Sequence, residues 1–220
     1  MTLRRRSDWT PIPAANAHKF VPSEVDGVAI HYNGPPVSKA ALTDPRAFLR
    51  GILRFHKAAP RSWSDIAYNL AVDQRGNVWD LRGLRHRSGA NGDEAVNRRY
   101  VAVYCVIGKG QKPSPEMLAG VRDAVAMVRA VYPHAREIKG HRDIRHGGTE
   151  CPGSDLYAAL KAGAFKPQPA VKELLEMKLT DKITIPARYD SNDTDQDVEV
   201  TVEDAFRRIY EWAWKAAHRP

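Results

Sequence analysis

The chain has 220 residues, of which 43% are hydrophobic, and a formal net charge of +8. This hydrophobic fraction is sufficient for a folded core and excludes an intrinsically disordered chain. The length favours one ordinary domain with an appendage or two small domains, and no stretch approaches the roughly 18 apolar residues of a membrane span.

The positive charge favours polyanionic partners, such as nucleic acids, anionic lipid head groups or acidic cell-wall polymers. Basic residues are spread along the chain without a nucleic-acid-binding motif, so we expect no nucleic-acid partner. The segment Met1–Asp8 is basic but lacks the apolar stretch of a secretory signal, so we expect no signal peptide.

The first half of the chain predicts a strand and then a helix. Residues 27–33 are apolar and partly β-branched, as in a short strand. Asp44 and Pro45 are typical of a helix start, and the helix should end near Pro60. Apolar residues follow within it at helical spacing: Phe48, Ile52 and Phe55.

A hairpin and a central strand come next. Residues 66–72 and 78–81 predict its two arms around a Gly-containing turn. Residues 100–107 are nearly all apolar, which suits a strand covered on both faces. Ser114 and Pro115 then mark a second helix start, whose apolar stripe comprises Leu118, Val121, Val125 and Val128.

The series of predicted elements ends with a strand over residues 137–141 and a helix over 154–163. This order predicts an α/β fold with a mixed central β-sheet flanked by helices. We assign residues 1–165 to that domain and residues 166–220 to a linker and C-terminal segment. A capping box at Thr201–Asp204 predicts a small helical appendage there, for docking, oligomerisation or wall binding.

Cys105 and Cys151 are the only cysteines, which excludes a disulfide framework. Cys105 lies inside an apolar run and is expected to pack as a small hydrophobic residue. A disulfide between the two is the alternative, and it would remove the thiolate that a metal site needs.

Three residues with metal-binding side chains stand at predicted strand ends or just after them: His31, His141 and Cys151. Two histidines and a thiolate can hold zinc and leave its fourth position open. Spacing alone links them weakly, because the chain has neither His-x-x-x-His nor Cys-x-x-Cys. The alternative for a histidine on a strand is a satisfied core or surface residue.

Several pieces of the chain, in the same order, resemble the zinc-dependent N-acetylmuramoyl-L-alanine amidases of the peptidoglycan-recognition-protein superfamily, the type 2 amidases. The resemblance covers roughly residues 20–165. The matching pieces are Ile30–Asn33, Trp63–Leu70, Gly76–Asp80, Gly140–Asp143 and Thr149–Gly153.

The resemblance implies that His31, His141 and Cys151 bind Zn²⁺. It also implies that Tyr68 is a catalytic tyrosine, the alternative being a core tyrosine on a half-buried strand. Thr149 matches a position where relatives carry a lysine or threonine that helps to stabilise the negative charge developing in the reaction. A neutral threonine hydroxyl should stabilise this charge less than a lysine ammonium does.

Two features depart from the family pattern. The segment between His141 and Cys151 is about two residues longer than in many relatives, and His146 within it is an alternative ligand. Ala67 stands where relatives often have glycine.

The resemblance further implies hydrolysis of the amide between N-acetylmuramic acid and L-alanine in peptidoglycan. Without a signal peptide, the chain resembles a phage endolysin that stays in the host cytoplasm until a holin opens the membrane; a prophage-encoded or virion-associated lysin is the alternative. The alternatives are a non-catalytic peptidoglycan receptor and a zinc peptidase of the stem peptide. The sequence does not predict the oligomeric state.

A cluster of basic residues follows the predicted hairpin and surrounds Asn91. This cluster is either a solvated surface or a rim that contacts the carboxylates of the stem peptide. Separately, Trp63 could either stack on a sugar or join the core. The cluster comprises Arg82, Arg85, His86, Arg87, Arg98 and Arg99.

Overall fold

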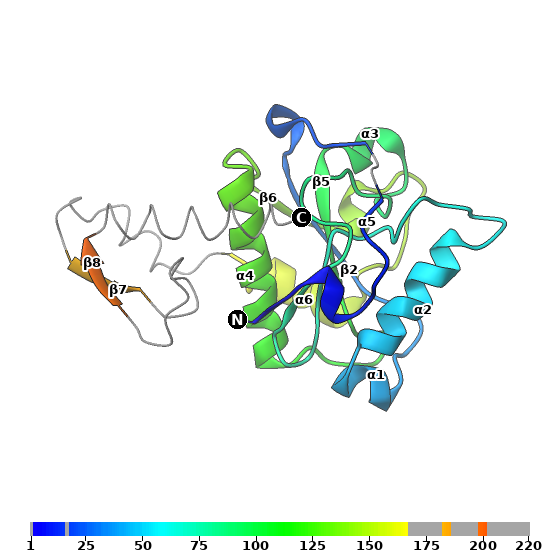
Figure 1. The fold of residues 1–220 in the computed structure, drawn as a ribbon, viewed down its shortest axis with the longest axis horizontal. Helices are drawn as coiled ribbons and strands as arrows, with labels where there is room; N and C mark the ends of the chain where they lie inside the picture. Colours follow the sequence, from blue (N-terminus) through cyan, green and yellow to red (C-terminus); the bar gives the residue numbers. More distant parts are fainter. Residues whose placement is uncertain (1, 16–17, 167–181, 186–197, 202–220) are drawn as a thin grey trace. The chain divides into compact units, whose positions relative to one another are not determined.

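The computed structural model describes residues 2–15, 18–166, 182–185 and 198–201. The chain divides into two compact units, residues 1–166 and 167–220. In the first unit, the strands form one mixed sheet flanked by helices, which confirms the predicted fold class (Figure 1). Its strands are β1 (Leu3–Arg4), β2 (Gly27–His31), β3 (Leu70–Val72), β4 (Val78–Asp80), β5 (Tyr100–Cys105) and β6 (Glu137–Gly140). Its α-helices are α1 (Lys39–Thr43), α2 (Arg46–Lys57), α3 (Glu94–Asn97), α4 (Pro115–Val131), α5 (His141–Ile144) and α6 (Ser154–Lys161).

The strands lie in the order β1-β4-β3-β5-β2-β6, and only the hairpin pair β3 and β4 is antiparallel. Every residue of β5 is buried, as predicted for a strand covered on both faces. Because β2 and β5 are parallel, with His31 opposite Tyr104, both strands end at the same edge of the sheet. Residues that follow these strands are therefore close in space.

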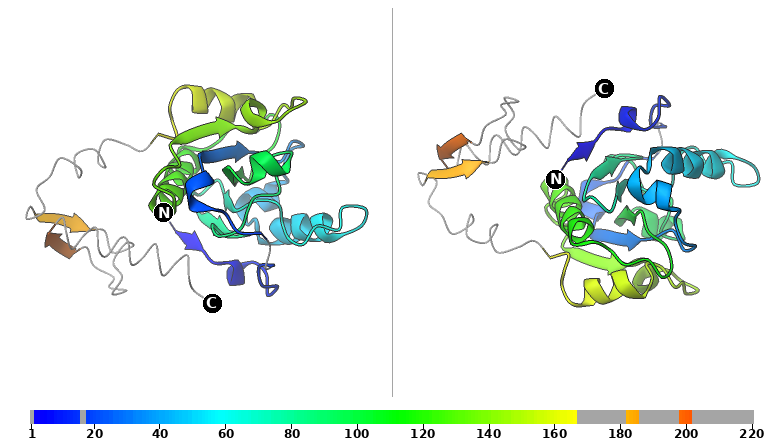
Figure 2. Two further views of the ribbon diagram at one scale, coloured as in Figure 1. Left: turned by 90° about the horizontal axis from the view of Figure 1, so that it is seen from above. Right: turned by 90° about the horizontal axis from the view of Figure 1, so that it is seen from below.

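Alternation along the strands divides the side chains of the sheet between cores on its two sides. Val28 and Ile30 join the core beneath α4, whereas the cluster beneath α2 takes Tyr104 and Val106 from the sheet. Figure 1 shows α4 and α2 on opposite sides of the sheet, and both views in Figure 2 show the same layers. His31 alternates with Ile30 and therefore points away from α4.

The two long helices begin and end close to the predicted positions. The Ser114 side chain accepts a hydrogen bond from the Met117 amide and caps α4, with Pro115 in the first turn as predicted. In α2, the buried residues are Leu49, Leu53 and His56, one position beyond the predicted apolar series. Phe55 is 56% exposed, and the Arg61 guanidinium lies 3.9 Å from its ring centre.

The first arm of the hairpin is shorter than predicted, because β3 begins at Leu70 rather than Ile66. The buried Asn69 adds its side chain to the backbone pairing: its backbone amide donates to the Ala102 carbonyl at 3.0 Å, and its Oδ1 accepts a hydrogen bond from the Ala102 amide at 3.0 Å. The Asn69 amide group donates to the carbonyl oxygens of Gly83 and His86. This residue therefore ties the segment that carries Tyr68 to the sheet.

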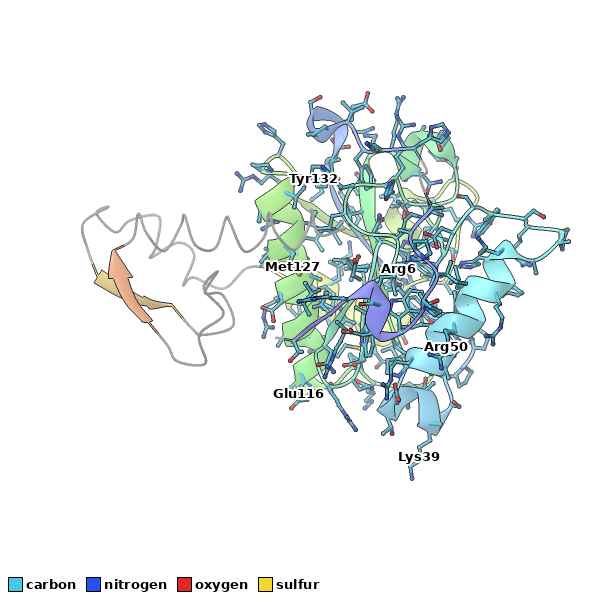
Figure 3. The ribbon with its side chains drawn as sticks, in the orientation of Figure 1. Arg6, Lys39, Arg50, Glu116, Met127 and Tyr132 are labelled. Atoms are coloured by element: carbon cyan, nitrogen blue, oxygen red, sulfur yellow. The ribbon has the colours of Figure 1, made fainter. Side chains whose placement is uncertain are left out.

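The N-terminal segment adds an edge strand that the sequence did not predict. β1 pairs in parallel with β4, and Arg6 then donates to the Leu81 carbonyl and pairs with Asp65 at 2.8 Å. Arg50 on α2 donates to the Trp9 carbonyl at 2.9 Å. Figure 3 labels Arg6 and Arg50 on these two segments.

In the C-terminal unit, β7 (Lys182–Ile185) and β8 (Val198–Thr201) form an antiparallel pair that the sequence did not predict. The predicted linker after Lys166 and the helix after Thr201 lie outside the described residues. Within the described parts of both units, no helix combines the length and the apolar character needed to cross a membrane.

Candidate metal centre

The last residue of β2, His31, is held in one orientation by Asn91. His31 Nε2 lies 2.9 Å from Asn91 Oδ1, while Asn91 Nδ2 donates to the Tyr100 carbonyl at 2.9 Å. Because the Tyr100 carbonyl can only accept, Asn91 Oδ1 is the acceptor for His31, and Nε2 carries the proton. His31 Nδ1 therefore keeps a free lone pair, and it lies 3.7 Å from Cys151 Sγ.

The second histidine, His141, begins α5 directly after β6. It is buried, and its Nε2 has no hydrogen-bond partner among the described residues. The imidazole rings of His31 and His141 have centres 4.4 Å apart. A buried nitrogen without a partner costs about 1–3 kcal/mol, so this atom needs a ligand that the protein itself does not supply.

Cys151 reaches the two histidines through a loop that turns at Gly147 and Gly148, both with positive φ. The Arg142 amide donates to the Cys151 carbonyl at 2.9 Å, and the Cys151 amide donates to Thr149 Oγ1 at 3.2 Å. These bonds hold the sulfur in place, and both Cys105 and Cys151 are free thiols rather than a disulfide.

The three side chains fit a tetrahedral zinc ion. Their ligand atoms all lie within 4.8 Å of one another. Zinc bonds of 2.0–2.3 Å in tetrahedral geometry require ligand atoms about 3.3–3.8 Å apart, so a small adjustment suffices. The exposed His146 lies outside this group, so the longer loop brings Cys151 rather than its own histidine to the site.

Burial sets the protonation states at the site. Burial lowers the pKa of His31 to about 3, and the neighbouring imidazole of His141 contributes to this shift. Burial also lowers the pKa of His141 to about 4, and the positive charge of Arg145 is the next cause. Both imidazoles are therefore neutral at pH 7, as metal ligands must be. Burial also raises the pKa of the Cys151 thiol to about 12, and a coordinated cation would reverse this by deprotonating the sulfur.

Tyr68 lies beside the three candidate ligands. Its ring contacts the His31 ring edge-on, with ring centres 5.4 Å apart. It stacks on the Tyr104 ring, with ring centres 4.5 Å apart. Burial, followed by the negative charge of Cys151, raises the pKa of Tyr68 well above its ordinary value. The phenol therefore stays protonated and can donate a hydrogen bond. The half-buried Thr149 accepts from the Cys151 amide and keeps its own hydroxyl proton for another partner.

A pocket of about 300 Å³ opens at Tyr68 and His141. Its remaining walls come from the end of α2, the segment before β3, the loop before α3 and the loop after α5. The other lining residues are His56, Trp63, Ala67, Gly89, Ala90, Gly92 and Arg145.

A second pocket, of about 250 Å³, is lined by chain neighbours of the candidate ligands rather than by the ligands themselves. Tyr32, which follows His31, contributes to it, as do Glu150 and Pro152 on either side of Cys151. Of the two pockets, the one at Tyr68 therefore reaches a candidate ligand directly, through His141.

Sequence reasoning missed Asn91 and His56. Asn91 lies in a loop of small residues, and no local pattern indicates that it contacts His31. His56 carries a signal, because it continues the buried helical series of Leu49 and Leu53. Its Nδ1 accepts from the Ala67 amide at 3.1 Å, and burial lowers its pKa to about 4.

Most of the basic cluster, expected to be either a solvated surface or a rim, is engaged within the protein. Arg82 is buried and donates to backbone carbonyls. Arg87 pairs with Glu94 at 2.6 Å, and Arg99 pairs with Asp26. These guanidinium groups hold loops together, so they are not free to receive a ligand.

Comparison with known proteins agrees with this geometry. The family model of N-acetylmuramoyl-L-alanine amidases (Amidase_2) matches residues 21–154. The chain is 27% identical over 165 residues to N-acetylmuramoyl-L-alanine amidase of Sus scrofa, and the match covers 72% of this chain and 27% of the relative. It is 30% identical over 118 residues to the Mus musculus amidase, covering 52% and 22%, respectively. The chain spans only about a quarter of the length of these relatives.

Solved structures show the same fold. Drosophila PGRP-LB superposes with a TM-score of 0.63 at 24% identity, covering 74% of this chain and 94% of that chain. PGRP-LE in complex with tracheal cytotoxin, a monomeric diaminopimelic acid-type peptidoglycan, superposes with a TM-score of 0.60 at 25% identity, covering 73% and 93%. With its family match over more than half of its length, the chain belongs to the N-acetylmuramoyl-L-alanine amidase family, as its sequence pattern predicted.

Proposed function

We propose that this chain is a zinc-dependent N-acetylmuramoyl-L-alanine amidase. It hydrolyses the amide that joins the lactyl group of N-acetylmuramic acid to L-alanine in peptidoglycan. The observation that carries the proposal is the convergence of His31, His141 and Cys151, with His141 Nε2 buried and unpaired among the described residues. Family membership supports the substrate class.

His31, through Nδ1, His141, through Nε2, and Cys151 would hold the ion. When bound, zinc supplies an electrophile that polarises the scissile carbonyl and acidifies water. Tyr68 keeps its phenolic proton because it is buried, and it donates to the amide oxygen as negative charge develops there. Thr149 supplies a second, neutral hydroxyl donor beside Cys151.

The pocket at Tyr68 suits a part of the substrate next to the scissile bond, because it includes the candidate ligand His141. Its walls combine aromatic and imidazole rings with one guanidinium, that of Arg145. A substrate held there would have its amide beside the candidate ligands.

The test uses purified cell walls, with and without a chelator, and identifies the new amino termini. Chelator-sensitive release of L-alanine amino groups, with about one zinc per chain, is the expected result. A Cys151→Ser variant is the matched control for metal loss. Binding to walls without any release would indicate a receptor, and new termini at other residues would indicate a peptidase.

The cellular role is a narrower proposal, namely lysis of a bacterial host by a phage endolysin. The net charge of +8 supports attraction to acidic wall polymers. Expression inside bacteria should cause lysis only when a holin is expressed with it. Lysis at the same rate without a holin would contradict this role.

A further inference from the structure

Arg145 brings a positive charge to the pocket that contains Tyr68 and His141. No carboxylate lies among the described residues that line this pocket, and its guanidinium is the one permanently charged group among them.

The base of the Arg145 side chain is held firmly. Its amide donates to the His141 carbonyl at 3.0 Å. Its methylenes lie against Gly92, where an added Cβ would come within 3.2 Å of Arg145 Cγ. Gly92 follows Asn91, the residue that orients His31, so the arginine packs against the loop that supports the metal centre.

The guanidinium of Arg145 forms no ion pair among the described residues, in contrast to those of Arg87 and Arg99. A free guanidinium beside a pocket without acidic groups suits an incoming carboxylate, which it can bind through two parallel hydrogen bonds. The peptide part of peptidoglycan is acidic, and its first free carboxylate follows soon after the scissile amide.

We propose that Arg145 binds this carboxylate and makes the pocket selective for stem peptides whose second residue is acidic rather than amidated. The peptide half of the substrate then occupies the pocket at Tyr68, while the amide lies at the candidate ligands. This inference rests on the proposed function, because it takes the substrate class from it.

The experiment measures binding by calorimetry with metal-depleted protein, so that no turnover interferes. Its ligands are two muramyl dipeptides that differ in one group, the α-carboxylate or the carboxamide of the second residue. The wild-type protein should prefer the carboxylate. Arg145→Gln should weaken carboxylate binding about tenfold and leave carboxamide binding unchanged within twofold, which removes the preference.

Two further variants sharpen the result. Arg145→Lys keeps the charge but loses the planar fork, so it should retain part of the preference. Arg136→Gln removes an exposed charge next to the start of β6, at the opposite end of the strand from His141, and should bind both ligands as the wild type does.

Equal weakening of both ligands by Arg145→Gln, or no change in either, would overturn the role of Arg145. Failure of the wild-type protein to bind either ligand would overturn it as well. If the preference depends on Arg145 but zinc-loaded protein releases no L-alanine termini, the carboxylate site stands and the proposed hydrolysis fails.

Discussion

His31 and Cys151 come within 3.7 Å of each other, but different kinds of structure bring them there. His31 ends a strand that is paired on both sides, and its ring is fixed by Asn91. Cys151 lies on a loop with two glycines of positive φ, held by a few backbone bonds. One half of the site is therefore preformed by the sheet, whereas the other half can adjust to an ion.

The largest effect should follow from removing the sulfur on the loop side. Cys151→Ser should lose bound zinc and at least about 1000-fold of amidase activity, because serine does not supply a thiolate. His146→Ala is the matched control in the same loop, and it should keep its zinc. Metal analysis of both purified variants checks this, and zinc retained in the first or lost in the second would reverse our assignment of the loop ligand.

A somewhat smaller effect is expected between the two halves, at the Tyr68 hydroxyl. Tyr68→Phe keeps the ring stacked on Tyr104 but removes the donor, so kcat should fall about 100- to 1000-fold with little change in the melting temperature. Tyr104→Phe removes a hydroxyl that donates to Asn33, and it should retain most of the activity. Similar losses of kcat in both variants would argue against a specific role for Tyr68.

On the strand side, Asn91→Ala should weaken zinc binding about 10- to 100-fold, because His31 loses the partner that fixes its tautomer. Asn97→Ala is the control, because Asn97 does not contact His31: its Oδ1 accepts a hydrogen bond from the backbone amide of Asn91. This variant should weaken zinc binding less than Asn91→Ala does. Competition with a chelator measures both affinities. Unchanged affinity in Asn91→Ala would show that the sheet alone orients the histidine.

Acid should destabilise the metal-free protein through its buried histidines. The pKa of His31 lies at about 3 and those of His56 and His141 at about 4, against an ordinary value of 6.5. Between about pH 6.5 and pH 4 the unfolded chain therefore binds more protons, so stability falls as the pH falls through this range. Melting temperatures of chelator-treated protein should decline below about pH 6.5, and the decline should be shallower in His56→Asn. A flat profile would contradict the buried neutral state.

The smallest effect concerns the glycines of the adjustable half. Gly148→Ala introduces a Cβ into open space at φ +75°, so only the backbone conformation opposes it, at about 1 kcal/mol. Gly51→Ala in α2 also meets no atoms, and there the same change should stabilise by about 0.5–1 kcal/mol. Denaturant unfolding of the two variants should give opposite signs, and equal signs would show that the loop tolerates other backbone conformations.

Much of the fold was predictable because it depends on local patterns. The Ser114–Pro115 helix start and the fully apolar strand β5 follow from capping and burial rules. The early end of the hairpin arm was not predictable, because the side chain of Asn69 pairs with β5 across a long sequence separation. The strand β1 was missed for the same reason, since two residues carry no periodicity and depend on pairing with β4.

At the candidate site, sequence motifs identified the residues that the structure brings together in space, but not the groups that support them. Asn91 contacts His31 only because the loop before α3 folds onto the end of β2, and no spacing rule encodes that contact. The arginines after the hairpin were expected either to be solvated or to contact a ligand, yet Arg82 is buried. Whether a charged side chain is free depends on tertiary contacts, which composition does not reveal.

The separation of the candidate ligands along the chain has a consequence for how the protein folds. About 110 residues lie between His31 and His141, and the fold brings the two together through β2, which ends at His31, and β6, which His141 follows. Pairing of β2 with both β5 and β6 has to come first, and such distant contacts form slowly. Zinc would therefore bind late and lock an already assembled sheet, unlike the ion of a zinc finger, which initiates the folding of its domain.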